Sequence, residues 1–212
     1  MENLNYIIIE GLVRSGKTKL SNIISKNLNA KLIVDDKNNP FINDFYNSLA
    51  KGENGFGLKN QLIFLLNRYT QQVEMKQKGL FHKTMVSNYL FFREGIYSHL
   101  VLNDEELEIY KRIFNIFSEN IIKPDLVVYL QISFSEMLKR IKNSDNEFER
   151  NVPHEYWREL FEAYNYYFFN YKASPLLVIN IEKIDLDNEK DVKNLLCEIN
   201  EHKKGTKYYA PL

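Results

Sequence analysis

The sequence predicts an α/β fold in which a five-stranded parallel sheet is covered by helices on both faces. Each of five short runs is almost continuously apolar, as in strands that are buried on both faces. The stretches between these runs are longer and carry apolar residues at helical spacing, so strands and helices alternate along the chain. The predicted strands are residues 5–10, 30–35, 84–88, 125–132 and 175–180.

Two of the intervening stretches show helical periodicity most clearly. Residues 103–121 carry an apolar stripe, and Asn103 with the acidic residues after it is a typical helix start. Residues 18–28 directly follow the first predicted strand and place four apolar side chains on one face. These four are Leu20, Ile23, Ile24 and Leu28.

The chain is expected to form one domain. Its 212 residues are enough for a single sizeable core. Neither an internal repeat nor a linker divides the sequence, so we assign residues 1–203 to this domain. The segment 204–212 lacks periodicity and is expected to be a C-terminal tail.

Charge and cysteine content limit the partners and the compartment. Lys plus Arg and Asp plus Glu number 28 each, so no overall field attracts nucleic acid or an anionic membrane. The single cysteine, Cys197, excludes an internal disulfide and suits a reducing compartment. No apolar run approaches the roughly 20 residues of a membrane span. We therefore expect a cytoplasmic protein whose partners are small molecules or proteins.

Residues 11–18, GLVRSGKT, match the phosphate-binding pattern G-x-x-x-x-G-K-[ST] between a strand and a helix. The glycines let backbone N–H groups converge on phosphate oxygens, and the helix N-terminus adds partial positive charge. Lys17 can bridge the outer phosphates, and the Thr18 hydroxyl can ligate Mg²⁺. The motif predicts binding of a nucleoside triphosphate, which we take to be ATP. The predicted phosphate-binding residues are Gly11, Arg14, Ser15, Gly16, Lys17 and Thr18.

Switch proteins, motor ATPases and small-molecule kinases share this loop, so other residues must decide between them. Several further stretches, in order and nearly end to end, resemble the bacterial branch of the deoxynucleoside kinase family, which phosphorylates deoxyadenosine, deoxyguanosine or deoxycytidine. The stretches are NPFINDFY (39–46), QLIFLLNRYTQQ (61–72), LFHKTMVSNYLFFREGIY (80–97), KPDLVVYLQ (123–131), LKRI (138–141), FERNVPHEYWRELFEAYNYYFF (148–169) and SPLLVIN (174–180).

The resemblance implies a P-loop kinase fold with a five-stranded parallel sheet, a lid loop over the phosphates and a helix-mediated homodimer. It implies transfer of the γ-phosphoryl group of ATP to a deoxynucleoside 5′-hydroxyl, with Mg²⁺, in nucleotide salvage. It also implies roles for a nucleoside pocket. Gln61 would bind the nucleobase, Arg68 would lie beside the base with Glu94 as its acidic partner, and Tyr46 and Glu149 would hold the sugar 3′-hydroxyl.

The chain departs from the family around the reacting groups. Val34 stands where the family has the glutamate that acts as base. The next residue, Asp35, can replace it only if the strand end turns its side chain toward the site, since a one-residue slip reverses the face; Asp36 is the alternative. Asn88 stands where an acid usually supports Mg²⁺. Tyr89 fills a frequent arginine position, for which Arg93 could substitute.

The predicted lid also departs from the family, in which it is rich in arginine. Arg140 is kept and Arg150 could help from the far end of the loop, but Ser144 and Asn146 stand at the next two arginine positions. Arginines there would neutralise charge on the transferred phosphoryl group. We assign Lys17, Asp35 and Arg140 as the catalytic residues.

Three functions follow from these observations. The first is a working deoxynucleoside kinase that is slow or depends on a partner subunit. The second is a degenerate relative that acts as a nucleotide-binding or protein-interaction module, which a stable complex without phosphoryl transfer would favour. The third is a nucleoside monophosphate kinase, against which the weak lid and the retained Gln61 speak.

Overall fold

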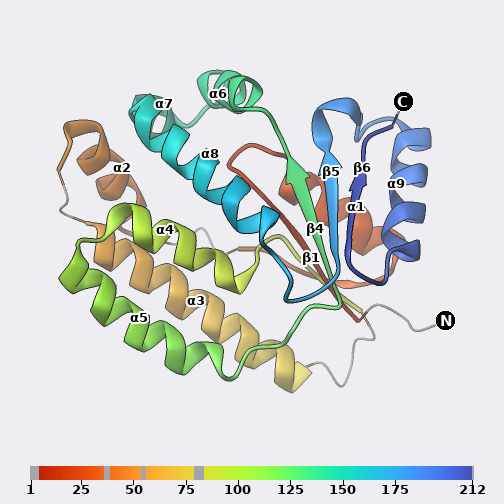
Figure 1. Cartoon of the computed structure of the whole chain (residues 1–212), viewed down its shortest axis with the longest axis horizontal. Helices are drawn as coiled ribbons and strands as arrows, with labels where there is room; N and C mark the ends of the chain where they lie inside the picture. The colour runs from red at the N-terminus through yellow and green to blue at the C-terminus, as the bar shows by residue number, and fades with distance from the viewer. Residues whose placement is uncertain (1–4, 36–38, 54–55, 79–83, 212) are drawn as a thin grey trace.

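The computed structural model of the chain describes residues 5–35, 39–53, 56–78 and 84–211 (Figure 1). Six parallel strands form one sheet in the order β2-β3-β1-β4-β5-β6, and helices flank it. The α/β class is confirmed, and the five predicted strands correspond to β1–β5. The strands are β1 Tyr6–Gly11, β2 Lys31–Ile33, β3 Met85–Ser87, β4 Leu126–Gln131, β5 Leu176–Asn180 and β6 Thr206–Tyr209.

The sixth strand lies in the segment that was expected to be a tail. β6 pairs with β5 in parallel, with Val178 opposite Tyr208. The expectation of an irregular tail is therefore wrong over Thr206–Tyr209. This strand was hidden in the sequence because it lies at the sheet edge and is mostly exposed, so it carries no apolar run.

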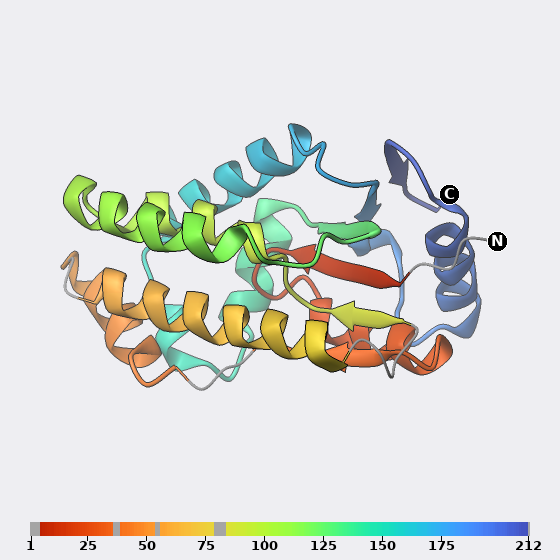
Figure 2. The same cartoon turned by 90° about the horizontal axis from the view of Figure 1, so that it is seen from below.

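The helices connect the strands and cover the sheet. Figures 1 and 2 show α8 on one face, across β1 and β4, and α1 on the opposite face. None of the helices in the described residues is long and apolar enough to cross a membrane. The α-helices are α1 Lys17–Asn27, α2 Ile42–Lys51, α3 Gly57–Lys78, α4 Glu94–Val101, α5 Asp104–Ser118, α6 Phe134–Lys142, α7 Glu147–Asn151, α8 His154–Phe169 and α9 Glu189–Glu201, and the short 3-10 helices are η1 Phe91–Arg93 and η2 Ile181–Lys183.

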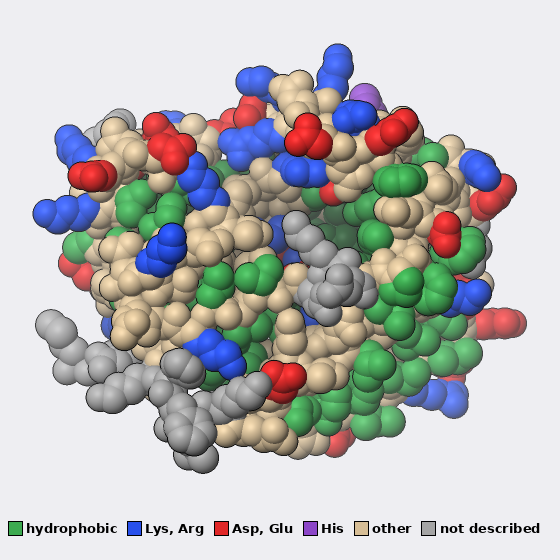
Figure 3. Space-filling model, turned by 180° about the vertical axis from the view of Figure 1, so that it is seen from behind, with side chains coloured by type: hydrophobic (Ala, Val, Ile, Leu, Met, Phe, Trp, Pro, Cys, Tyr) green, Lys and Arg blue, Asp and Glu red, His purple; other side chains and the backbone are tan. Residues whose placement is uncertain are grey.

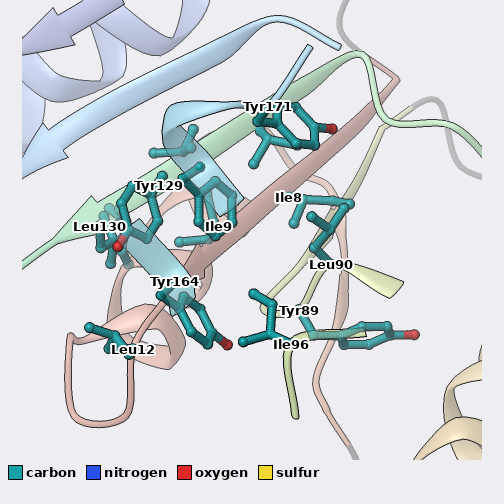
Figure 4. Packing of buried hydrophobic residues seen from close by; sticks show 14 of the residues in the cluster. Ile8, Ile9, Leu12, Tyr89, Leu90, Ile96, Tyr129, Leu130, Tyr164 and Tyr171 are labelled. Atoms are coloured by element: carbon teal, nitrogen blue, oxygen red, sulfur yellow. The ribbon is translucent and has the colours of Figure 1, made fainter. Parts of the chain in front are cut away.

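The core forms where α8 packs on the central strands. β1 is buried along its whole length, as its continuous apolar character predicts. The ring of Tyr129 in β4 stacks on Phe168 of α8, with ring centroids 4.0 Å apart. Figure 4 shows Tyr164 of α8 beside the residues of β1 and β4 in this cluster. This packing fixes β1, and with it the loop that follows β1.

The predicted start of α5 is confirmed in detail. The Asn103 side chain accepts a hydrogen bond from the Glu106 backbone N–H, and the Glu106 carboxylate accepts one from the Asn103 N–H. This capping box satisfies two N–H groups that a helix end otherwise leaves unpaired.

Parallel strands bring the loops that follow them to one edge of the sheet. The segments after β1, β2 and β3 therefore meet at their carboxyl ends, where α/β folds bind ligands. The residues assigned from sequence lie mostly in these segments and on α2, α3, α4 and α7.

Candidate active site

The loop after β1 has the shape of a phosphate-binding loop. A Cβ atom on Gly11 would lie 2.8 Å from the Leu130 carbonyl oxygen and 2.7 Å from Ser15 Oγ, so a side chain does not fit there. Gly16 has φ 96°, a left-handed conformation that glycine adopts without strain. Arg14 also has positive φ, at 61°. Gly11 is thus required by close packing, and Gly16 by its backbone conformation.

Lys17 and Thr18 begin α1 directly after this loop. The Lys17 ammonium group donates hydrogen bonds to the carbonyl oxygens of Gly11 and Leu12, at 2.6 and 2.9 Å. Burial lowers the pKa of Lys17 to about 8, although the nearby Glu10 carboxylate acts in the opposite direction. The ammonium group is therefore held on the loop, within a site whose surroundings favour its neutral form.

A pocket of about 600 Å³ joins the loop to the residues that were assigned to the nucleoside. Figure 3 shows a hollow on the rear face, with basic side chains in and above it. Most of the residues assigned from sequence line this pocket; Gly11 and Arg140 do not. The assigned residues that line it are Arg14, Ser15, Gly16, Lys17, Thr18, Asp35, Tyr46, Gln61, Arg68, Asn88, Glu94 and Glu149.

The side chains assigned to the nucleoside come together from the four helices α2, α3, α4 and α7. Gln61 and Arg68 lie on α3, each only 2% exposed, and both line the pocket, as expected from their spacing of two helical turns. The Arg68 guanidinium forms an ion pair with Glu94 of α4. Tyr46 of α2 lines the same pocket, and burial together with the Glu149 charge raises the pKa of its hydroxyl.

Asp35 faces the pocket because β2 ends early. The strand stops at Ile33, and the Val34 carbonyl accepts a hydrogen bond from Gln71. Asp35 then lines the pocket instead of turning to the other face of the sheet. The strand end supplies the bend that the sequence argument required. The alternative base, Asp36, lies outside the described residues.

Two arginines hold the Asp35 carboxylate. Arg68 donates to both oxygens, Nε to Oδ1 at 2.8 Å and Nη2 to Oδ2 at 2.7 Å. Arg93 donates to Oδ2 at 2.5 Å and reaches Glu10 Oε1 at 3.3 Å. Burial by itself raises the pKa of Asp35, but these guanidinium groups outweigh it and lower the value to about 2.

Arg93 is itself held in the charged form. Burial disfavours the charge, but the carboxylates of Glu10 and Asp35 raise the pKa of Arg93 well above its ordinary value. Tyr89, at the frequent arginine position of the family, is fully buried in the core instead. Tyr89 has no guanidinium group, so Arg93 supplies one to Asp35 in its place.

Asn88 turns its amide nitrogen, not its oxygen, toward the phosphate loop. Its Oδ1 accepts the backbone N–H of Asp35 at 2.7 Å, and its Nδ2 lies 3.1 Å from Thr18 Oγ1. The backbone N–H can only donate, so it fixes which end of the amide faces it. Asn88 thus joins the ends of β2 and β3 to α1, and it presents its amide nitrogen, not its oxygen, to the Thr18 hydroxyl.

The lid is a short turn between α6 and α7. Arg140 of α6 donates to Glu136 at 2.8 Å and to the Arg14 carbonyl at 3.2 Å, so it supports the phosphate loop from outside the pocket. Asn146 caps α7 and donates to Glu149 Oε1 at 3.1 Å. The Arg14 guanidinium forms an ion pair with Glu149 Oε2 at 2.7 Å.

Sequence reasoning missed Glu10 and the aromatic wall of the pocket. Glu10 is fully buried and also accepts the Leu90 N–H at 2.7 Å. Its only sequence signal is an acid within the otherwise apolar run YIIIEG. Tyr97 and Trp157 line the pocket from α4 and α8. The apolar stretches that contain them predict a core equally well, so no signal distinguished these two residues.

A phosphate-binding loop that opens into one pocket with a buried polar subsite defines a P-loop kinase for a small acceptor. The sequence model of the family described as deoxynucleoside kinase matches residues 7–203. The chain belongs to the deoxynucleoside kinase family.

Relatives agree with this assignment, and a solved structure shares the fold. The chain is 26% identical over 171 residues to a deoxyguanosine kinase of Bacillus subtilis, an alignment that covers 77% of this chain and 78% of the relative. It is 26% identical over 216 residues to a deoxyadenosine kinase of Lactobacillus acidophilus, covering 93% and 96%. A structure of deoxyadenosine kinase from M. mycoides with bound dATP superposes with a TM-score of 0.77 at 24% identity, covering 92% and 100%.

Proposed function

We propose that the protein transfers the γ-phosphoryl group of ATP to the 5′-hydroxyl of a deoxynucleoside. Membership of the deoxynucleoside kinase family supports phosphorylation of a nucleoside by a nucleotide donor. The observation that carries the proposal is the single pocket, in which Lys17 and Thr18 share one space with Gln61 and Arg68. A module that binds only a nucleotide has no use for the second half of this pocket.

The acceptor half suits a nucleoside. The Gln61 amide can both donate to and accept from the edge of a nucleobase, and a buried site that makes such bonds rejects ligands without matching groups. Tyr46 and Glu149 lie at the same pocket and can hold the sugar 3′-hydroxyl. Arg68 is fixed by Asp35 and Glu94, so it is preorganised beside the base.

Asp35 is the group proposed to face the attacking hydroxyl. The acceptor oxygen bonds to the γ-phosphorus while the bond from that phosphorus to the departing ADP oxygen breaks. The hydroxyl proton passes to the Asp35 carboxylate and then to water. With a pKa of about 2, Asp35 is ionised at neutral pH and orients the hydroxyl, and it receives the proton late, as the new bond forms.

Lys17 and Thr18 are proposed to hold the phosphates and Mg²⁺. The Thr18 hydroxyl fits Mg²⁺, which takes few protein ligands, keeps several waters and binds substrate phosphates. The Asn88 amide fits less well, because it presents its nitrogen and not its oxygen to Thr18. Within the described residues no group of three or more His, Cys, Asp and Glu could hold a metal ion. Bound Mg²⁺ would neutralise charge on the phosphate oxygens.

A homodimer is proposed through α3 and α5. Leu66 of α3 is 48% exposed, and Ile109 and Ile116 of α5 are 51% and 65% exposed. These helices lie side by side in Figures 1 and 2, and hydrophobic side chains gather over the lower right of Figure 3. An apolar surface of this kind marks an association site.

Cytoplasmic nucleotide salvage is the role that we propose for the enzyme, because salvage pathways use free deoxynucleosides as substrates.

A phosphorylation panel tests the function. The protein is incubated with Mg²⁺, ATP labelled at the γ-phosphate, and each of the four deoxynucleosides or their 5′-monophosphates. We expect labelled 5′-monophosphate from at least one deoxynucleoside, and loss of that product in Lys17→Ala. Phosphorylation of a monophosphate only would assign a monophosphate kinase, and no transfer to any acceptor would leave a binding module.

A further inference from the structure

We infer that Arg14 is a catalytic arginine that replaces those missing from the lid; this rests on the proposed phosphoryl transfer. Charge spreads over the three outer oxygens of the γ-phosphoryl group as it moves, and a guanidinium group beside them accelerates the step. The lid positions 144 and 146 are Ser and Asn. Asn146 is occupied in capping α7, so neither position supplies positive charge.

The basic residues of the pocket divide by location. Arg68 and Arg93 are buried at the acceptor side and are held by Asp35, Glu94 and Glu10. Lys17 is bound to the loop carbonyls. The basic residues that line the pocket are Arg14, Lys17, Lys19, Arg68 and Arg93. Arg14 is the guanidinium group among them that extends from the phosphate loop.

The two arginines beside the lid turn, Arg140 on α6 and Arg150 on α7, do not reach the phosphate end of the pocket. Arg140 lies outside the pocket lining and donates to Glu136 and to the Arg14 carbonyl, which stabilises the loop from behind. Arg150 donates to the Ser144 carbonyl within the lid turn and is also outside the lining. We therefore assign Arg140 a positioning role, on the Arg14 backbone.

The contact of Arg14 with Glu149 suggests how substrate brings it into use. Arg14 Nε and Nη2 lie 2.8 and 2.7 Å from Glu149 Oε2, and the Arg14 side chain is 36% exposed. The Glu149 side chain is 12% exposed, so Arg14 is the more accessible partner, and a bound triphosphate can offer its guanidinium group a second anion. A sugar hydroxyl on Glu149 competes for its carboxylate while the γ-phosphate attracts Arg14. Occupation of both subsites thus moves the guanidinium to the reacting group.

Steady-state kinetics of the full-length protein test this assignment with the deoxynucleoside that gives the highest turnover. Arg14→Gln should lower kcat by roughly 10²–10³-fold, as loss of one donor to transition-state charge does, with a smaller change in KM for ATP. Adding Asn146→Arg to Arg14→Gln should restore part of kcat. Arg150→Gln is the matched control, an arginine of the same region outside the pocket, and should keep kcat near the wild-type value.

Other results overturn the inference. If Arg14→Gln changes only KM for ATP, Arg14 is a binding residue and not a catalytic one. If Arg140→Gln lowers kcat far more than Arg14→Gln does, the lid kept the catalytic arginine. An inactive wild-type protein would instead refute the proposed function itself, and circular dichroism of each variant separates loss of fold from loss of catalysis.

Discussion

The two halves of the pocket are built differently. The acceptor side, which is proposed to bind the deoxynucleoside, holds one buried network of ion pairs. Its members are Arg68, Arg93, Asp35, Glu94 and Glu10. On the phosphate side, the pairs of Arg14 and Arg140 are partly exposed, and Lys17 binds its own loop. The acceptor half is thus preorganised by burial, whereas the phosphate half is completed by its ligand. Substitutions in the charge network of the acceptor half should therefore act mainly on stability, and substitutions in the phosphate half on ligand binding and turnover.

The largest effect is expected from Lys17→Ala on the phosphate side. It removes the ammonium group aimed at the outer phosphates, so we expect turnover to fall at least roughly 10²–10³-fold and ATP affinity to be lost. Calorimetric titration with ATP measures the affinity. Because burial disfavours the charged ammonium group, its removal should not lower the melting temperature. An unchanged affinity for ATP would refute the loop assignment.

The next effect is expected on stability, from Arg93→Gln on the acceptor side. This change leaves the carboxylates of Glu10 and Asp35 buried with one cation fewer. Removing one partner of a buried pair costs about 3–5 kcal/mol in the free energy of unfolding. Urea denaturation measures this difference, with the exposed i,i+4 pair variant Arg112→Gln as a control that should cost at most about 0.5 kcal/mol. Equal costs for the two variants would contradict the contrast between the halves.

A smaller effect is expected from Gln61→Ala, which removes bonds to the nucleobase alone. Deoxynucleoside affinity should fall by about 1–3 kcal/mol, which is roughly a 5- to 150-fold rise in Kd, while ATP affinity stays the same. Separate calorimetric titrations with the deoxynucleoside and with ATP measure the two affinities. Equal losses for nucleoside and ATP would mean that Gln61 supports the pocket as a whole.

The pH dependence of Lys17 gives the smallest and sharpest test of the phosphate side. Its pKa is about 8 in the folded protein and 10.5 in the reference state, so between these values the unfolded chain binds more protons. The contribution of Lys17 to the free energy of unfolding therefore rises with pH from about 8 to 10.5.

Bound phosphate favours the charged form of Lys17, so ATP binding should take up a fraction of a proton near pH 8.5. Calorimetry in buffers with different ionisation enthalpies measures this uptake. Lys17→Arg, which stays charged, should abolish it. The same uptake in Lys17→Arg would assign the proton to another group.

Much of the fold could be predicted from the sequence because strands that are buried on both faces of a parallel sheet consist almost entirely of apolar residues. The runs around Ile7 and Val127 gave β1 and β4 to within a residue or two. β6 was not predictable in this way, because an exposed edge strand needs no apolar pattern. β6 pairs with β5 through backbone hydrogen bonds, and its side chains carry no pattern that predicts this pairing.

The site was predictable in its members but less so in its contacts. The motif and the resemblance placed Lys17 and Gln61 at the pocket, where the structure has them. The orientation of Asp35 could not be derived, since it depends on the residue at which β2 ends. The orientation of the Asn88 amide depends on the backbone N–H of Asp35, which comes from a distant part of the chain. Local patterns do not encode such pairings between loops.

A crystal structure with a deoxynucleoside and a non-hydrolysable ATP analogue bound together would test the central claim most directly. We predict the triphosphate on the loop at 11–18, the nucleobase within hydrogen-bond distance of the Gln61 amide, about 3 Å, and the 5′-hydroxyl between Asp35 and the γ-phosphate. A nucleoside bound elsewhere, or a base that does not contact Gln61, would contradict the account.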